Sequence, residues 1–257
     1  MTDRSGAGLS TENLTVRYGG VVANHNVSLT VQPREIVGLI GPNGAGKTSF
    51  VDAITGFTAS AGSVTLDGAD ITHLAPHRRR RVGLARTWQS GELFGNLSVA
   101  ENVTAALRPG GFSTVLTDLF GRRRHRADPA VTEALHAVGL ADAGATPARD
   151  LTLGRQKLAG VARALVGNCR ILLLDEPAAG LDSQESRDFA ERIRGVAESG
   201  PGVLLIDHDI SLVLGVCDRL YVMEFGRIIF SGTPAEARVD PAVIAAYLGA
   251  PKEQADV

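Results

Sequence analysis

Residues 36–55 restrict the fold more than any other part of the sequence. Ile36–Ile40 is an apolar run that is typical of a fully buried strand. The next eight residues read Gly41-Pro42-Asn43-Gly44-Ala45-Gly46-Lys47-Thr48 and match the pattern G-x-x-x-x-G-K-[ST]. A helix is predicted from about Gly46 to Thr55. The glycines let backbone N–H groups surround phosphate oxygens, and the start of the helix adds its positive dipole end. The sequence therefore predicts a phosphate-binding loop.

The side chains of this loop predict a site for ATP and Mg²⁺. We expect Lys47 to reach the β- and γ-phosphates and the Thr48 hydroxyl to bind Mg²⁺. The residues expected to line the nucleotide are Asn43, Gly44, Ala45, Gly46, Lys47, Thr48 and Ser49. Of 26 basic residues only Lys47, Lys157 and Lys252 are lysines, so a lysine at this position favours a need for a compact ammonium. The alternative is a plain glycine-rich turn.

A second apolar run ends in two carboxylates. Ile171–Leu174 predicts a central strand, and Asp175 and Glu176 follow at the edge where ligands of α/β folds bind. Asp175 suits the coordination of Mg²⁺, and Glu176 suits orienting or deprotonating the attacking water. The alternative is a solvated strand end without chemistry.

Two further segments carry weaker signals. Val203–Ile206 predicts another buried strand, and His208 just after it is placed to contact a γ-phosphate or the nucleophilic water, unless it is only structural. Thr152 and Gly154 precede an apolar-periodic helix and form an anion-ready start, unless they simply cap that helix. His73 and His77 are separated by Pro76, which breaks the helix that would align them, so no metal site made of protein ligands alone is predicted.

The order of the patterns predicts one α/β core with a helical insert. Loosely alternating apolar residues over 13–31 indicate half-buried strands, and strands alternate with helices beyond Gly167. Such alternation favours a parallel sheet covered by helices. Between them the pattern is helical, with a Ser98–Glu101 capping box opening a helix to about Leu107. We expect a single domain over 1–257, with a core of 1–89 and 168–257 and a helical subdomain of 90–167.

Composition excludes several classes of protein. The net charge of −2 gives no global reason to expect nucleic-acid binding. No apolar run approaches the roughly 20 residues of a membrane span, and no signal peptide is visible at the start. Two cysteines favour a reducing compartment, so we expect a cytosolic protein. The arginine runs 77–81 and 122–126 are interpreted as solvated faces, although the second is also suited to lipid headgroups.

Taken in order, these elements resemble the ATP-binding cassette (ABC) family over nearly the whole chain. Tyr18 falls where the family stacks an aromatic ring on adenine, and 178–182 resembles its D-loop. The resemblance implies a P-loop NTPase (RecA-like) core with an N-terminal antiparallel β subdomain. It also implies that two such domains sandwich two ATP molecules. Gln89 would bind Mg²⁺, sense the nucleotide and move the insert against membrane subunits.

Finer features resemble the ATP-binding subunits of branched-chain amino-acid importers. They are the segments 85–89, 97–103, 176–181 and 240–249, while 108–128 suits the longer of the two subunit types. The expected partners are a second ATP-binding subunit, two integral membrane permeases and, indirectly, a solute-binding protein. The chain would then lie peripherally on the cytoplasmic face of the membrane. Alternatives are an ABC ATPase that transports nothing and a P-loop kinase.

The signature segment departs from the family's Leu-Ser-Gly-Gly-Gln. It reads Leu151-Thr152-Leu153-Gly154-Arg155, so the hydroxyl and one glycine are kept. By resemblance, Thr152 and Gly154 contact the partner subunit's ATP. Arg155 would add a positive charge there and hold that ATP without accelerating its hydrolysis.

Overall fold

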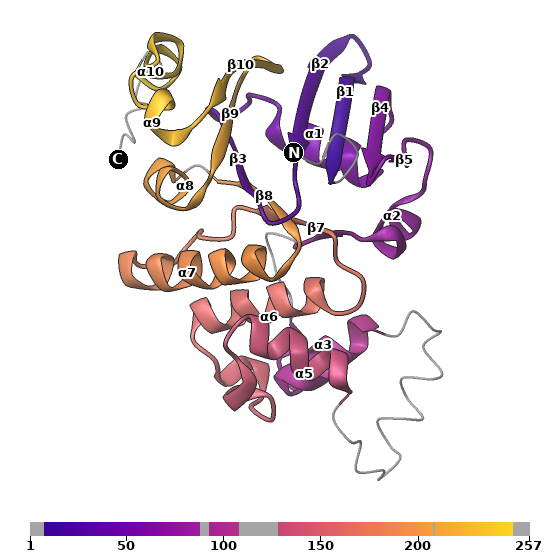
Figure 1. The fold of residues 1–257 in the computed structure, drawn as a ribbon, viewed down its shortest axis with the longest axis vertical. Coiled ribbons are helices and arrows are strands. Elements are labelled where there is room, and N and C mark those ends of the chain that lie inside the picture. The colour runs from indigo at the N-terminus through magenta and orange to yellow at the C-terminus, as the bar shows by residue number, and fades with distance from the viewer. Residues whose placement is uncertain (1–7, 88–92, 108–127, 208, 249–257) are drawn as a thin grey trace, which may run out of the picture.

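Two β-sheets form the centre of the computed structural model, which describes residues 8–87, 93–107, 128–207 and 209–248 (Figure 1). The antiparallel sheet has the order β2-β1-β4-β5. Its strands are β1 (Leu9–Tyr18), β2 (Val21–Val31), β4 (Ser60–Leu66) and β5 (Ala69–Asp70). The second sheet has the order β10-β9-β3-β8-β7-β6, with only β10 antiparallel to its neighbour. Its strands are β3 (Ile36–Ile40), β6 (Leu84–Arg86), β7 (Ile171–Asp175), β8 (Gly202–Ile206), β9 (Arg219–Glu224) and β10 (Arg227–Gly232). The predicted α/β fold with an antiparallel subdomain is confirmed.

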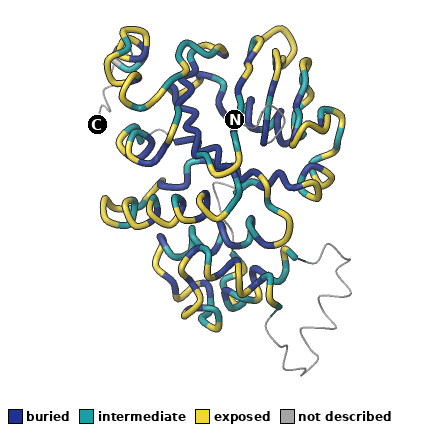
Figure 2. Tube along the Cα trace, viewed as in Figure 1, coloured by how far each residue is buried: buried dark blue, intermediate teal, exposed yellow. Residues whose placement is uncertain are grey.

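The central strands are buried on both faces because alternate residues enter two different cores. Leu172 and Leu174 pack among the helices, whereas Leu173 packs with the antiparallel sheet and the helix after the phosphate loop. All five residues of β3, β7 and β8 are buried (Figure 2). This two-sided burial explains the continuous apolar runs in the sequence and fixes the ends of these strands, where the polar residues begin.

Helices cover the mainly parallel sheet and form a separate group at one end of the molecule (Figure 1). That group contains α3 (Val99–Leu107), α5 (Pro129–Ala137), α6 (Leu153–Leu165) and the short η1 (Ala141–Ala143) and η2 (Ala148–Asp150). The others are α1 (Lys47–Thr55), α2 (Pro76–Val82), α7 (Ser183–Ser199), α8 (Ile210–Val216), α9 (Pro234–Ala237) and α10 (Pro241–Leu248). Over the described ranges, no helix has the length and apolar character needed to cross a bilayer.

The predicted capping box opens α3 as expected. The Ser98 backbone N–H donates to Glu101 Oε2 at 2.7 Å, and the Glu101 N–H donates to Ser98 Oγ at 3.2 Å. Two donors at the helix start are thereby satisfied by local side chains. The beginning of the insert is thus determined locally by its own sequence.

The arginine run 77–81 is only in part the solvated face that the sequence predicted, because His77, Arg78 and Arg81 are exposed but Arg79 and Arg80 are not. Arg79 on α2 is 4% exposed and donates to the Ala53 and Ile54 carbonyl oxygens at 2.8 and 2.7 Å. Arg80 donates to the carbonyl oxygens of Ala164 and Val166 near the end of α6. Each guanidinium therefore binds the negative end of another helix, which stabilises a cation there. The second run, 122–126, lies outside the described residues.

Candidate nucleotide-binding site

The predicted chemical residues meet at the carboxyl ends of four adjacent strands. In the sheet β3, β8, β7 and β6 are consecutive neighbours and run parallel. Gly41 follows β3, Asp207 follows β8, Asp175 ends β7 and Arg86 ends β6. Loops at this edge of an open α/β sheet are the usual place for a ligand. The fold therefore collects polar residues that are far apart in the chain.

The phosphate loop is held by neighbouring segments. Asn24 on β2 is fully buried, and its Nδ2 donates to the Gly46 carbonyl oxygen at 3.1 Å. From the β9–β10 turn, the Gly226 N–H donates to the Ala45 carbonyl oxygen at 2.8 Å. At Gly46, with φ 104°, a Cβ would lie 2.6 Å from the Ala23 carbonyl oxygen, so only glycine fits. Hydrogen bonds and close packing from β2 and from the β9–β10 turn thus fix the conformation of the loop.

The first turn of α1 presents uncapped backbone donors. Its N-cap is Gly46 in the left-handed region, and no side chain caps the helix. Asn43, Gly44 and Thr48 are exposed around it. The first N–H groups of a helix lack intrahelical partners, and the helix dipole makes their surroundings positive. A phosphate group would satisfy these donors.

Lys47 supplies the positive side chain of the site. Its Nζ donates to the carbonyl oxygens of Gly41 and Pro42 at 2.6 and 3.0 Å, and the residue is 8% exposed. Burial lowers the pKa of Lys47, while the nearby charges of Glu176, Asp175 and Asp207 act in the opposite direction. The ammonium group therefore sits between the phosphate loop and the carboxylates that follow β7 and β8.

Asp175 and Glu176 are placed differently although they are adjacent. Asp175 is 5% exposed, and its Oδ2 accepts from the Arg86 guanidinium at 2.8 Å. Glu176 has φ 45°, and its N–H donates to the Ile206 carbonyl oxygen at 2.7 Å. A left-handed conformation in a residue with a side chain costs about 1–3 kcal/mol and occurs most often at functional sites. The strained backbone at Glu176 is thus directly adjacent to the buried, paired Asp175.

Asp207 is a part of this cluster that the sequence interpretation did not assign. It is fully buried, and its carboxylate accepts from the Ala178 and Asp209 N–H groups at 3.3 and 3.0 Å. It therefore connects the turn after Glu176 with the segment after β8. Its position at the end of a buried strand was the available signal. The predicted His208 and Gln89 lie outside the described residues, and their roles stay predictions.

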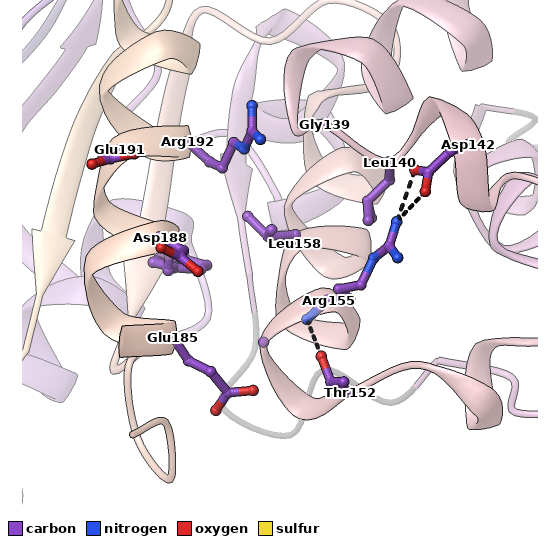
Figure 3. A pocket seen from close by; sticks show the side chains of 12 residues that line it. Gly139, Leu140, Asp142, Thr152, Arg155, Leu158, Glu185, Asp188, Glu191 and Arg192 are labelled. Carbon is purple, nitrogen blue, oxygen red and sulfur yellow. Dashed lines mark hydrogen bonds and ion pairs between the residues drawn. The ribbon is translucent and has the colours of Figure 1, made fainter. Parts of the chain in front are cut away.

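The signature residues lie in a different place, at the start of α6. They line a pocket of about 460 Å³ between α6, α7 and the η1 region (Figure 3). Thr152 caps α6 by accepting from the Arg155 N–H at 3.4 Å, and Gly154 is buried against Glu185. The structure therefore separates Thr152 and Gly154 from the cluster around Lys47.

The Arg155 guanidinium forms an ion pair within the insert. It reaches Asp142 on η1, with Nη2 at 2.7 and 2.9 Å from the two carboxylate oxygens (Figure 3). This hydrogen bond lowers the pKa of Asp142. In this chain the guanidinium is therefore paired inside the insert, and the role of Arg155 toward a partner's ATP stays a prediction.

Tyr18 is the last residue of β1, an inner strand of the antiparallel sheet. Its side chain is 48% exposed, and its hydroxyl lies 3.3 Å from Thr58 Oγ1. An exposed aromatic ring has a free face on which a flat base can stack. Its position is compatible with the predicted adenine contact.

The residues present fit Mg²⁺ bound together with a nucleotide. This ion prefers oxygen ligands and usually binds through one or two protein side chains plus substrate phosphates. The exposed Thr48 hydroxyl and the Asp175 carboxylate are such ligands. Within the described ranges, no cluster of three or more His, Cys, Asp or Glu could hold a metal by itself. A Mg²⁺ ion held by these residues would therefore need phosphate oxygens as further ligands.

The fold and this site define a P-loop ATPase domain with a helical insert. The profile of the family "ABC transporter" matches residues 24–179, and that of "Branched-chain amino acid ATP-binding cassette transporter" matches 227–253. The chain belongs to the ABC transporter family and is an ATP-binding, ATP-hydrolysing subunit.

Individual relatives agree with this assignment. The high-affinity branched-chain amino acid transport ATP-binding protein LivG of Salmonella typhimurium is 40% identical over 94% of this chain and 97% of its own length. The lipopolysaccharide export system ATP-binding protein LptB of Escherichia coli is 37% identical over 95% and 98%. An ATP-binding cassette of an ABC transporter in its ADP conformation has a TM-score of 0.81 and 28% identity, over 95% of this chain and 99% of that structure.

Proposed function

We propose that the chain powers an importer of branched-chain amino acids or related small polar solutes. The observation that carries this proposal is the match of residues 227–253 to the branched-chain transporter profile. This segment includes β10, α9 and α10, and lies outside the part that matches the general ABC profile. The names of LivG and of BraF from Pseudomonas aeruginosa, which is 37% identical, support the same substrate class.

The catalytic roles follow from the positions of the side chains. The α1 amides and Lys47 bind the triphosphate, and Thr48 and Asp175 hold Mg²⁺, with Gln89 added by resemblance. When bound, the metal neutralises charge on the phosphates. Glu176, next to Asp175 on its strained turn, orients and deprotonates the attacking water. His208 assists this step by the sequence prediction alone.

A second ATP-binding subunit is needed to complete this site. Thr152 and Gly154 line the pocket with α7 and η1, at a distance from the loop of their own chain. An arrangement in which each signature faces the partner's phosphate loop uses both surfaces. The proposal is therefore a sandwich of two ATP-binding subunits, identical or different.

Two membrane permeases would dock where the insert meets the core. A groove of about 520 Å³ lies between α2, α6 and the end of β6. Phe57 in its wall is 54% exposed, and α3 contributes Ala106. A cysteine at Leu93, before α3, is expected to cross-link to a permease, whereas a cysteine at Glu12 on β1 is not. The chain would then be peripheral at the cytoplasmic face, and a solute-binding protein would act only through the permeases.

Transport assays separate this proposal from its rivals. Reconstituted with the membrane subunits encoded beside it, the complex should hydrolyse ATP faster when a binding protein loaded with leucine, isoleucine or valine is added. Labelled amino acid should accumulate inside the vesicles. Release of lipopolysaccharide instead would support the exporter role of the relative LptB. If the chain hydrolyses ATP but no integral membrane protein co-purifies with it, an ABC ATPase that transports nothing would be favoured.

A further inference from the structure

Arg86 connects two carboxylates that belong to different elements of the site. Its Nη1 lies 2.6 Å from Asp52 Oδ1 on α1, and its Nη2 lies 2.8 Å from Asp175 Oδ2 at the end of β7. The side chain of Arg86 is 8% exposed, that of Asp175 5% and that of Asp52 28%. The arginine therefore forms a largely buried bridge between the phosphate-loop helix and the predicted metal-binding aspartate.

The bridge relates two of the protein ligands expected for the metal, Thr48 and Asp175. Thr48 is in the first turn of α1 and Asp52 in its second, so the position of Asp52 follows that of Thr48. A guanidinium is planar and donates from two nitrogens in a fixed geometry, whereas an ammonium is a point charge on a flexible stem. Arginine can therefore set the distance between the two carboxylates, which a lysine ammonium cannot.

Arg86 also lines the groove between the core and the insert. Beyond it, the Thr87 N–H donates to the Leu173 carbonyl oxygen at 2.9 Å, which continues the pairing of β6 with β7. One side chain thus contacts the metal-binding carboxylate on one side and borders the groove on the other.

We propose that Arg86 is a positioning residue, which fixes the Asp175 carboxylate relative to α1 and so prepares the Mg²⁺ site before the metal binds. The proposal rests on the Mg²⁺-dependent ATPase function proposed above. Residues that hydrogen-bond to a metal ligand typically change metal affinity by about 10–100-fold when they are replaced. The effect should appear in metal affinity and not in the binding of metal-free nucleotide.

The test measures Mn²⁺ binding to the full chain by electron paramagnetic resonance, with a non-hydrolysable ATP analogue present. Arg86→Gln and Arg86→Lys should both weaken Mn²⁺ binding by about 10–100-fold. Asp52→Asn, which alters only the α1 end of the bridge, should weaken it by about threefold to tenfold. Affinity for the analogue in EDTA should stay within about twofold in all three.

Arg170→Gln is the matched control. Arg170 just precedes β7 and pairs with Asp67 at 2.7 Å, but its side chain is 55% exposed and it lies at the opposite end of the strand. Its Mn²⁺ affinity should equal that of the unchanged protein. If Arg86→Gln fails to fold in a heat-denaturation assay, Arg86→Lys and Asp52→Asn decide the question.

The outcomes separate the two proposals. Unchanged Mn²⁺ affinity in Arg86→Lys overturns the positioning role, because charge alone would then be sufficient. Unchanged affinity in all variants overturns it as well, while the ATPase proposal stands. If the unchanged protein binds no Mn²⁺ with nucleotide, the proposed Mg²⁺ site itself is wrong.

Discussion

Two helices of this molecule begin at glycine-containing segments predicted to meet phosphate, and their first turns differ. The start of α1 has Gly46 in a left-handed conformation and no side-chain cap. The start of α6 is already capped, because the Thr152 side chain accepts from the Arg155 N–H. Unpaired N–H groups at a helix start need a partner, so α1 is suited to an anion as it stands. At α6 the Thr152 side chain already satisfies one of these donors, the Arg155 N–H.

The surroundings of the two helix starts also differ, because the start of α1 is held by neighbouring segments and the start of α6 is more exposed. Hydrogen bonds from Asn24 and Gly226 fix the loop before α1 from behind. The start of α6 borders a pocket of about 460 Å³, and Leu153 beside it is 44% exposed. A rigid start suits the chain's own nucleotide, whereas an exposed and capped start suits a contact that forms and breaks. The comparison leads us to expect the chemistry at α1 and β7, and contact with a partner at α6.

Glu176→Gln gives the most severe test of where the chemistry lies. The amide keeps the shape of the side chain but cannot accept the proton of water, so kcat should fall by about 10²–10⁴ while ATP still binds. ATPase rates and nucleotide-trapped dimers on gel filtration would show this. Glu198→Gln on the exposed side of α7 is the control. Normal turnover in Glu176→Gln would place the catalytic base elsewhere.

Lys47→Ala should act on binding and not mainly on the chemical step. A hydrogen bond to a charged group contributes about 1.5–3 kcal/mol, so ATP affinity should fall about 10- to 150-fold. The lysine on α6, Lys157, provides the contrast, and Lys157→Ala should change the affinity less than about threefold. Fluorescent ATP titrations measure both. If both variants lost the same amount of ATP affinity, the proposed difference between α1 and α6 in nucleotide binding would be wrong.

The sequence predicts those site residues that are recognised from the residues next to them in the chain. The phosphate loop follows a buried strand and opens a helix within 20 residues, so local rules are sufficient for Lys47 and Thr48. Arg86 could not be found in this way, because its two partners are 34 and 89 residues distant in the sequence. Arg79 looked like a solvated charge, and only the packing of α2 on the end of α1 buries it. The burial and the partners of Arg79 and Arg86 depend on contacts with residues far away in the sequence, so local patterns do not predict them.

Glycine substitutions compare the two helix starts directly. Gly46→Ala places a Cβ 2.6 Å from the Ala23 carbonyl oxygen at a φ of 104°, so the free energy of unfolding should fall by about 2 kcal/mol or more. Gly154 has no positive φ, and an added Cβ would lie 3.4 Å from Glu185 Oε1, at the end of a flexible side chain. Gly154→Ala should therefore stay within about 0.5 kcal/mol. Urea denaturation measures both, and equal losses would contradict the comparison.

Arg155→Gln should have the smallest effect and tests whether α6 acts on its own chain or on a partner. Because the guanidinium is bonded to Asp142, whose side chain is 72% exposed, stability should hardly change at neutral pH. The lowered pKa of Asp142 means that the pair stabilises the fold above the ordinary aspartate pKa. This contribution is lost as the pH falls through the lowered value.

The ATPase rate of a mixed complex identifies the nucleotide site on which Arg155 acts. With Glu176→Gln already in this chain, the remaining hydrolysis comes from the partner's site. If Arg155 influences only the insert, adding Arg155→Gln should change that rate by less than about twofold. A larger change would show that the ion pair with Asp142 opens when the subunits meet, and that the arginine then contacts the partner's ATP. Asp142→Asn distinguishes these two cases. It weakens the ion pair, so if Arg155 contacts the partner's ATP, Arg155→Gln should change the ATPase rate more in the Asp142→Asn background than in its absence.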